Sequence, residues 1–265
     1  MFDPFQIYNF WHFLFLGIFL TAAITLAIVF RKTKKEKLIT YIVLGILIAC
    51  EIVAMLATIE QEMIQINGSE EPATAFFYVT PWGLPFHLCS IQTIVIIAFI
   101  LIKNQKIKMA LITFFIPTSI AGAALALLIP TYPSQYGWFS VPGIEFLFFH
   151  GALIFYGLFM YIRKYREIKL IYIFHAYCIM FGLSFISIYI NSAVRKGANY
   201  FFTSSPPIEG LPILNLDNGW HMYLLTLLLL VVVLFAVMFS PVIIREIRFI
   251  IRKRKTGSSN DDINQ

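Results

Sequence analysis

The chain consists of long apolar stretches separated by short polar ones. These stretches are rich in Ile, Leu, Phe and Val and cover seven segments, at residues 10–30, 38–59, 84–102, 109–129, 142–162, 170–191 and 220–244. Because an α-helix rises 1.5 Å per residue, about 20 apolar residues cross the ~30 Å hydrocarbon core of a bilayer. The alternation of apolar and polar residues typical of a membrane barrel is missing from them. The pattern therefore predicts an all-α, polytopic membrane bundle of seven transmembrane helices.

The charges between the apolar segments predict how the bundle is oriented. Lys and Arg cluster after the first, third, fifth and seventh segments, whereas residues 60–83 contain four Glu and no Lys or Arg. Cytoplasmic loops of membrane proteins carry an excess of Lys and Arg. We therefore expect the N-terminus outside and the C-terminus in the cytoplasm. Arg195 and Lys196, on the predicted outer side, are a mild exception.

Composition supports a membrane protein and argues against nucleic acid as a partner. Of the 265 residues, 59% are hydrophobic and 13% are charged, against roughly 25% charged in soluble domains. Mean hydropathy is +0.80. The net charge of +6 comes largely from the short loop clusters, which set topology. We expect one transmembrane domain at residues 1–250 and a basic, then disordered, cytoplasmic tail at 251–265; the oligomeric state stays open.

The cysteines do not form a metal-binding or disulfide pattern. Cys50, Cys89 and Cys178 each lie inside an apolar segment, and no CxxC pair occurs. A buried free Cys usually behaves as a small hydrophobe, which is our interpretation of Cys50 and Cys178. No metal, nucleotide or haem site is indicated, so no cofactor is expected.

Unusual polar side chains fall at one predicted depth. At 1.5 Å per helical residue, Cys89 lies ~8 Å below the outer boundary, and Glu51 and His150 lie ~12 Å from it. A charge at the bilayer centre costs ~2.5–3.5 kcal/mol on insertion scales, so such groups rarely face lipid. The shared depth favours one cavity opening toward the outer leaflet. The alternative is that each group is satisfied singly by a backbone carbonyl or by interfacial water.

Cys89 and His150 are the pair with catalytic potential. His87 and Cys89 are two residues apart, hence about 200° apart on a helix, and cannot pair with each other. If Cys89 is a nucleophile, its base must come from another helix, and His150 has the matching depth. Glu51 could orient the imidazole, and His87 could hold a headgroup phosphate or an ester carbonyl. An inert, packed Cys89 is the alternative.

Several motifs resemble one family. Residues 84–90, Leu-Pro-Phe-His-Leu-Cys-Ser, resemble the hallmark of the YwaF-type bacterial integral membrane proteins, whose animal relatives are the transmembrane protein 164 acyltransferases. Residues 122–130 are similar to the family's glycine-alanine segment ending in Pro, and residues 148–151 to its His-Gly. The stretch from Asn199 to Trp220 resembles its Asn-Tyr…Pro…Asp…Trp loop. The resemblance covers about residues 38–220.

The resemblance implies lipid acyl chemistry. It assigns Cys89 as the nucleophile and His150 as the base, with membrane phospholipids or lysophospholipids as substrates. Asn199, Tyr200 or His87 would stabilise the oxyanion. The expected protein is a multi-pass acyltransferase or lipid hydrolase in the plasma membrane of a bacterium.

The remaining family positions are matched in part. Glu51 falls where family members carry a Glu in the second segment, and Trp220 matches the family's Trp. Thr131 stands where an Asp often follows the Pro, and the loop differs around Asn215 and Gly219. These departures bear on substrate choice.

A non-enzymatic function is the competing hypothesis. A transporter or lipid-binding membrane protein would use the same polar layer as a binding pocket. Transporters usually carry internal repeats and broken helices. Here only Pro117 indicates a break, and no internal repeat is visible, so the enzymatic interpretation leads.

Overall fold

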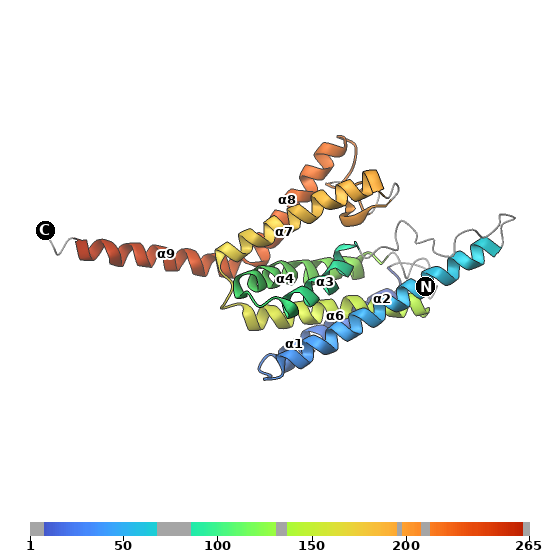
Figure 1. The fold of residues 1–265 in the computed structure, drawn as a ribbon, viewed down its shortest axis with the longest axis horizontal. Helices are drawn as coiled ribbons and strands as arrows, with labels where there is room; N and C mark the ends of the chain where they lie inside the picture. The colour runs from blue at the N-terminus through green and yellow to red at the C-terminus, as the bar shows by residue number, and fades with distance from the viewer. Residues whose placement is uncertain (1–7, 68–85, 131–136, 195–197, 208–212, 262–265) are drawn as a thin grey trace.

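The computed structural model describes residues 8–67, 86–130, 137–194, 198–207 and 213–261, without the side chains of 57–67, 194 and 253–261. This part of the chain is helical and contains no strand (Figure 1). Its α-helices are α1 Phe10–Phe30, α2 Glu36–Asn67, α3 Leu88–Leu101, α4 Gln105–Leu128, α6 Val141–Lys164, α7 Leu170–Tyr189, α8 Trp220–Met238 and α9 Ser240–Asp261. Two short turns complete them: a π-turn, η1 Ile190–Val194, and a 3-10 turn, η2 Tyr200–Phe202.

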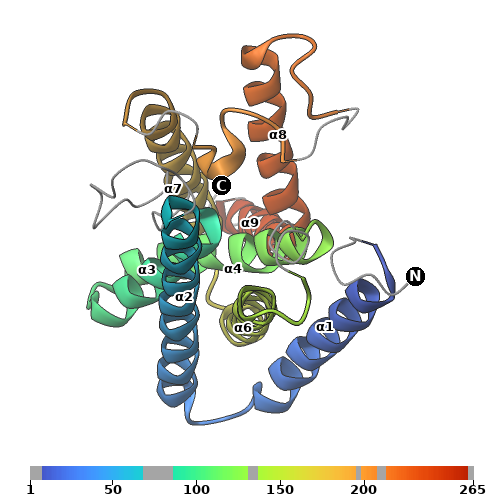
Figure 2. The same ribbon diagram turned by 90° about the vertical axis from the view of Figure 1, so that its right-hand side faces the viewer.

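Helices α4 and α6 form the centre of the bundle. Helix α6 packs against α1, α2 and α4, and Figure 2, which looks along α6, shows these three helices around it. Helix α4 also contacts α3 and α7. Both central helices are mostly buried, whereas α1 and α8 present most of their apolar side chains to the outside. Apolar side chains on the outside of a bundle are what a lipid environment requires.

Small residues let the central helices approach each other closely. A Cβ atom on Gly157 of α6 would lie 2.4 Å from the Ser119 Oγ atom of α4, and one on Gly151 would lie 2.6 Å from Phe19 Cδ1 of α1. Close contacts of this kind let van der Waals packing hold membrane helices together, since lipid supplies no hydrophobic driving force between them.

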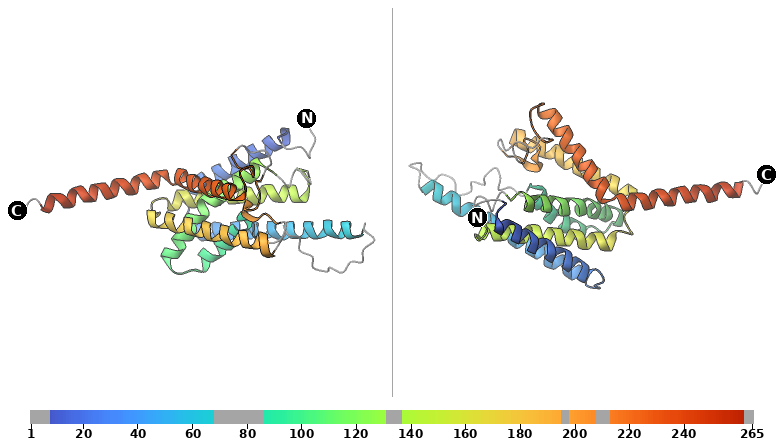
Figure 3. Two further views of the ribbon diagram at one scale, coloured as in Figure 1. Left: turned by 90° about the horizontal axis from the view of Figure 1, so that it is seen from above. Right: turned by 180° about the vertical axis from the view of Figure 1, so that it is seen from behind.

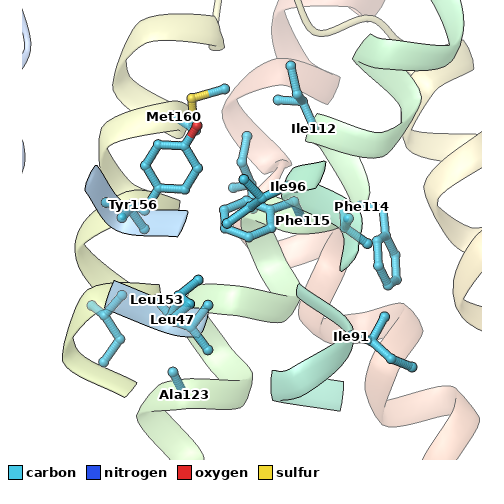
Figure 4. Close-up of a cluster of buried hydrophobic side chains, with 14 of the residues drawn as sticks. Leu47, Ile91, Ile96, Ile112, Phe114, Phe115, Ala123, Leu153, Tyr156 and Met160 are labelled. Carbon is cyan, nitrogen blue, oxygen red and sulfur yellow. The ribbon is translucent and has the colours of Figure 1, made fainter. Parts of the chain in front are cut away.

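An aromatic cluster fills the space between α2, α3, α4 and α6. The ring of Tyr156 lies 5.4 Å from that of Phe115 and 6.3 Å from that of Phe99, measured between centroids. Figure 4 shows Ile96 near Phe115 and Leu47 near Leu153. The Tyr156 hydroxyl is satisfied by Thr40 Oγ1 of α2 at 2.8 Å, so the cluster buries no unpaired phenol.

The basic connections meet at one end of the bundle. Arg163, at the end of α6, pairs with Glu36 of α2 at 2.8 Å and donates to the backbone carbonyls of Arg31 and Thr33. Arg245 of α9 donates to the carbonyl of Tyr165 at 2.9 Å. Loops predicted to share the cytoplasmic side therefore do lie together, although which side faces the cytoplasm stays a prediction.

The seven-span prediction is confirmed only in part. Six helices within the described residues are long and apolar enough to cross a membrane, and α3 is shorter, with 14 residues. At 1.5 Å per residue α3 spans about 21 Å, less than the ~30 Å hydrocarbon core. It begins at Leu88 rather than at residue 84, and residues 84 and 85 lie outside the described part.

Other helix boundaries also differ from the predicted ones. The segment predicted at 220–244 divides at Phe239 into α8 and α9, where Pro241 supplies no backbone N–H to continue the first helix. Helix α9 then continues past the bundle to Asp261 (Figure 3), so the tail predicted to be disordered is helical up to that residue. Helix α2 likewise continues beyond residue 59 to Asn67.

Replacing Gly157 with Leu should destabilise the bundle, because the added side chain would enter the space of Ser119 and Ile120. Overpacking costs about 1–3 kcal/mol, which corresponds to a drop in Tm of roughly 2–10 °C in detergent. Gly182→Leu on α7 is the control, since nothing lies within 4 Å of its added Cβ. Equal Tm values for the two variants would contradict the close crossing of α4 and α6.

Candidate functional site

The start of α3 is the point where several elements meet. His87 is the N-cap of α3, and its ring packs against Tyr200 of η2 at 4.9 Å between centroids. The side chain of Leu88 reaches Gly122 of α4. Cys89, the second residue of the helix, is partly buried. First-turn N–H groups have no intrahelical partner and attract negative charge, which suits a sulfur that becomes a thiolate.

Glu51 lies beside this cysteine. Its carboxyl group interacts with the Ser90 hydroxyl and lies within electrostatic range of Cys89 and of Glu145 on α6. Its Oε1 atom is buried and has no hydrogen-bond partner. Helices α2, α3 and α6 thus each contribute a polar side chain here. Glu145 and Ser90 belong to this group, although the sequence did not single them out as site residues.

His150 is held in the form that a general base requires. The residue is 7% exposed, and its Nδ1 atom lies 2.8 Å from the Phe146 carbonyl oxygen. Because a carbonyl only accepts hydrogen bonds, Nδ1 carries the proton and Nε2 keeps its lone pair in the neutral ring. Glu51 was expected to orient this ring, but the backbone carbonyl one helical turn away does so.

The pairing of Cys89 with His150 stays a prediction. Helices α3 and α6 are in contact, yet in the described residues no hydrogen bond joins the sulfur to the imidazole. A hollow of about 700 Å³ follows α1 and contains none of the predicted site residues. Its lining consists of Phe13, Leu14, Gly17, Ile18, Thr21, Ala22, Thr25 and Leu26.

The loop after α7 is fixed by buried polar contacts. Asn191 is the central clamp: its side chain accepts from the Tyr200 N–H at 3.0 Å and donates to the Tyr200 carbonyl and to Thr203 Oγ1, each at 3.0 Å. Asn199 folds the next turn by bonding to the backbone and side chain of Ser205. Asn199 is therefore engaged within the loop and acts as a positioning residue.

The start of α8 completes this clamp. Trp220 donates from Nε1 to the Thr203 carbonyl at 2.8 Å, and the Tyr223 hydroxyl donates to the carbonyls of Phe202 and Ser205. Phe201 and Phe202 adopt positive φ angles of 57° and 53°, which non-glycine residues hold only where the surroundings enforce them. The loop thereby presents Tyr200, fully buried, to His87 at the start of α3.

His12 is explained by packing. Its Nδ1 atom accepts from the Tyr8 N–H at 3.1 Å, so Nε2 carries the proton and donates to the Leu127 carbonyl at 2.8 Å. The ring stacks on Trp138 at 5.1 Å. Both ring nitrogens are therefore used, and the bond from Nε2 holds α1 against the end of α4.

Replacing Asn191 with Ala should release the loop at residues 198–207. The change leaves the Tyr200 N–H without its partner, at a cost of about 1–3 kcal/mol for a buried unsatisfied group. We expect faster chymotrypsin cleavage after Tyr200 and Phe201 and a lower Tm. Ser192→Ala, one position further and exposed, is the matched control; equal cleavage rates in both variants would contradict the clamp.

Comparison with known proteins identifies the family of this chain. No curated protein and no solved structure matches the chain. A family model does match, over residues 7–239, which include every helix from α1 to α8 and all the site residues described above. The chain therefore belongs to the TMEM164 family.

Proposed function

We propose that the protein is a membrane-embedded acyltransferase or lipid hydrolase that acts on phospholipid acyl chains from the outer half of the bilayer. The observation that carries this proposal is the placement of Cys89 in the first turn of a helix that starts among α2, α4 and η2. Family membership supports it, because the animal members that residues 84–90 and 148–151 resemble are acyltransferases. His150, with Nε2 as the accepting ring nitrogen, supplies the base.

The reaction proceeds by two acyl transfers. The Cys89 sulfur loses its proton to His150 and attacks the ester carbonyl of a donor phospholipid. The C–S bond forms, the C–O bond breaks, and the leaving lysophospholipid oxygen takes the proton from His150. The hydroxyl of an acceptor lysophospholipid then attacks the thioester, and its proton returns through His150 to the sulfur. Water as the acceptor gives a fatty acid instead.

Some residues around Cys89 and His150 would contact the substrate, and others position the residues that do. His87 and Tyr200 lie together at the start of α3, where an ester carbonyl or a headgroup phosphate would approach Cys89. Asn199 and Trp220 hold the loop that carries Tyr200 and act through it. Glu51, on α2, lies within electrostatic range of the thiol.

A transporter or lipid-binding protein is the second candidate, favoured by one observation. Glu51 and Glu145 lie within electrostatic range of each other on facing helices inside the apolar bundle. Carboxyl groups at membrane depth often mark ion or proton pathways. Solute uptake in proteoliposomes that is unchanged by Cys89→Ser would support this candidate, and uptake that is absent would remove it.

Cys89→Ala should abolish labelling of the purified protein by a phospholipid analogue that carries an electrophile at its ester position. His150→Gln should slow labelling by about 10²–10⁴-fold, the usual contribution of a general base. Cys178→Ala, a change at an exposed thiol on α7, should label like the wild type. In-gel fluorescence measures all three rates.

The same variants give a test in cells. Lipid extracts from cells expressing the wild type should show acyl-chain exchange between phospholipids that Cys89→Ala extracts lack. Full labelling of Cys89→Ala, together with unchanged lipids, would overturn the proposal.

A further inference from the structure

Three buried side-chain oxygens in the described residues have no hydrogen-bond partner, and all belong to α2 and α3. They are Oε1 of Glu51, Oε1 of Gln92 and Oγ1 of Thr93. Gln92 is 0% exposed and Thr93 is 7% exposed. Buried polar atoms in folded proteins are nearly always paired, so three unpaired oxygens on two contacting helices call for a ligand.

The two oxygens on α3 lie on the side of the helix that carries Cys89. Gln92 and Thr93 follow Cys89 by three and four residues, and residues at these spacings share one helix face. Ile96, further along this face, is fully buried, so the face turns toward the interior of the bundle. Gln92 and Thr93 therefore lie one turn, about 5 Å, deeper than the sulfur, and Glu51 lies beside the sulfur on α2.

Thr93 differs from the other buried threonines and serines of the bundle. Thr113 donates to the Met109 carbonyl at 2.7 Å, Thr118 to that of Phe114 at 2.7 Å, and Ser184 to that of Met180 at 2.9 Å. Each of these hydroxyls is satisfied by the carbonyl four residues back in its own helix. The Thr93 hydroxyl makes no such bond and remains available to another group.

The unpaired atoms share one chemical character. The Gln92 amide uses its nitrogen on the Leu88 carbonyl, at 2.9 Å, which leaves the carbonyl oxygen as the free end. A glutamine carbonyl and a carboxylate oxygen accept hydrogen bonds, and a threonine hydroxyl accepts as well as donates. A group that carries an O–H donor matches this set.

We propose that Gln92 and Thr93, together with Glu51, bind the hydroxyl group that attacks the Cys89 thioester. This inference rests on the proposed function. Before the attack, the hydroxyl donates its hydrogen bond to an acceptor oxygen of Gln92 or Glu51. During the attack this hydrogen bond shifts to Nε2 of His150. The new C–O bond forms as the C–S bond breaks, and the proton passes from His150 to the sulfur. The hydroxyl belongs to a lysophospholipid, or to water in the hydrolytic branch.

The experiment separates the two half-reactions in the full-length protein in nanodiscs. The donor is phosphatidylglycerol with a fluorescent acyl chain, and the acceptor is lysophosphatidylglycerol. Acyl-Cys89 is measured as protein-bound fluorescence removed by neutral hydroxylamine. Thr93→Val and Gln92→Met should form it as fast as the wild type but transfer it to the acceptor about 10- to 100-fold more slowly.

Matched variants exclude a merely structural effect. Thr113→Val makes the same change at a threonine whose hydroxyl is already bound, and it should leave the transfer rate unchanged. Thr93→Ser keeps the hydroxyl and should restore transfer. Tm values identify variants that fail to fold, for which Thr93→Ser gives the result.

Each outcome separates this inference from the proposed function. Wild-type transfer rates in Thr93→Val and Gln92→Met, with normal acyl-Cys89, would overturn the inference and leave the function intact. Absence of acyl-Cys89 in the wild type would overturn the function. If transfer to the lysophospholipid slows and hydrolysis by water does not, the site binds the lysophospholipid hydroxyl. If both reactions slow equally, the site binds any attacking hydroxyl, including water.

Discussion

The close crossing of α4 and α6 determines where every other helix can pack. Gly157 of α6 leaves room for Ser119 of α4, and the rings of Phe115 and Tyr156 fill the space beside the crossing. Because interiors are packed as densely as organic crystals, the remaining helices can contact this pair only along its uncovered faces. Helices α1 and α2 take faces of α6, and α3 and α7 take faces of α4.

The short α3 follows from this arrangement and places its first turn inside the bundle. A helix that begins among other helices must satisfy its first N–H groups with something other than lipid. Here the surroundings of the first turn are polar: the Glu51 carboxyl, the Ser90 hydroxyl and the His87 ring. The loop clamped by Asn191 covers the other side through Tyr200. Polar side chains from α2 and α3 thereby lie around the first turn that carries Cys89.

Much of the fold could be predicted from the sequence because apolar length alone defines a membrane helix. Helices α1, α4, α6 and α7 were predicted to within a few residues at both ends, and basic residues of several loops do gather at one end. The start of α3 was missed because its boundary depends on tertiary packing. Depth placed Cys89 and His150 in one layer, but depth carries no information about which face a side chain occupies. Gln92 and Thr93 were not predicted as site residues. Their spacing of three and four residues from Cys89 was the one signal for them in the sequence.

The contrast between satisfied and unsatisfied polar groups is the strongest structural argument for a site on α3. Elsewhere in the part of the chain that the structure describes, buried polar side chains are paired: His12 uses both ring nitrogens, Asn191 uses both ends of its amide, and Thr113 bonds within its helix. An unpaired buried group costs about 1–3 kcal/mol, and a protein of ordinary stability has only about 5–15 kcal/mol in total. Three such groups together would be a large fraction of that stability. Their confinement, within the described residues, to the contacting helices α2 and α3 fits the proposed ligand, whose binding would offset the cost.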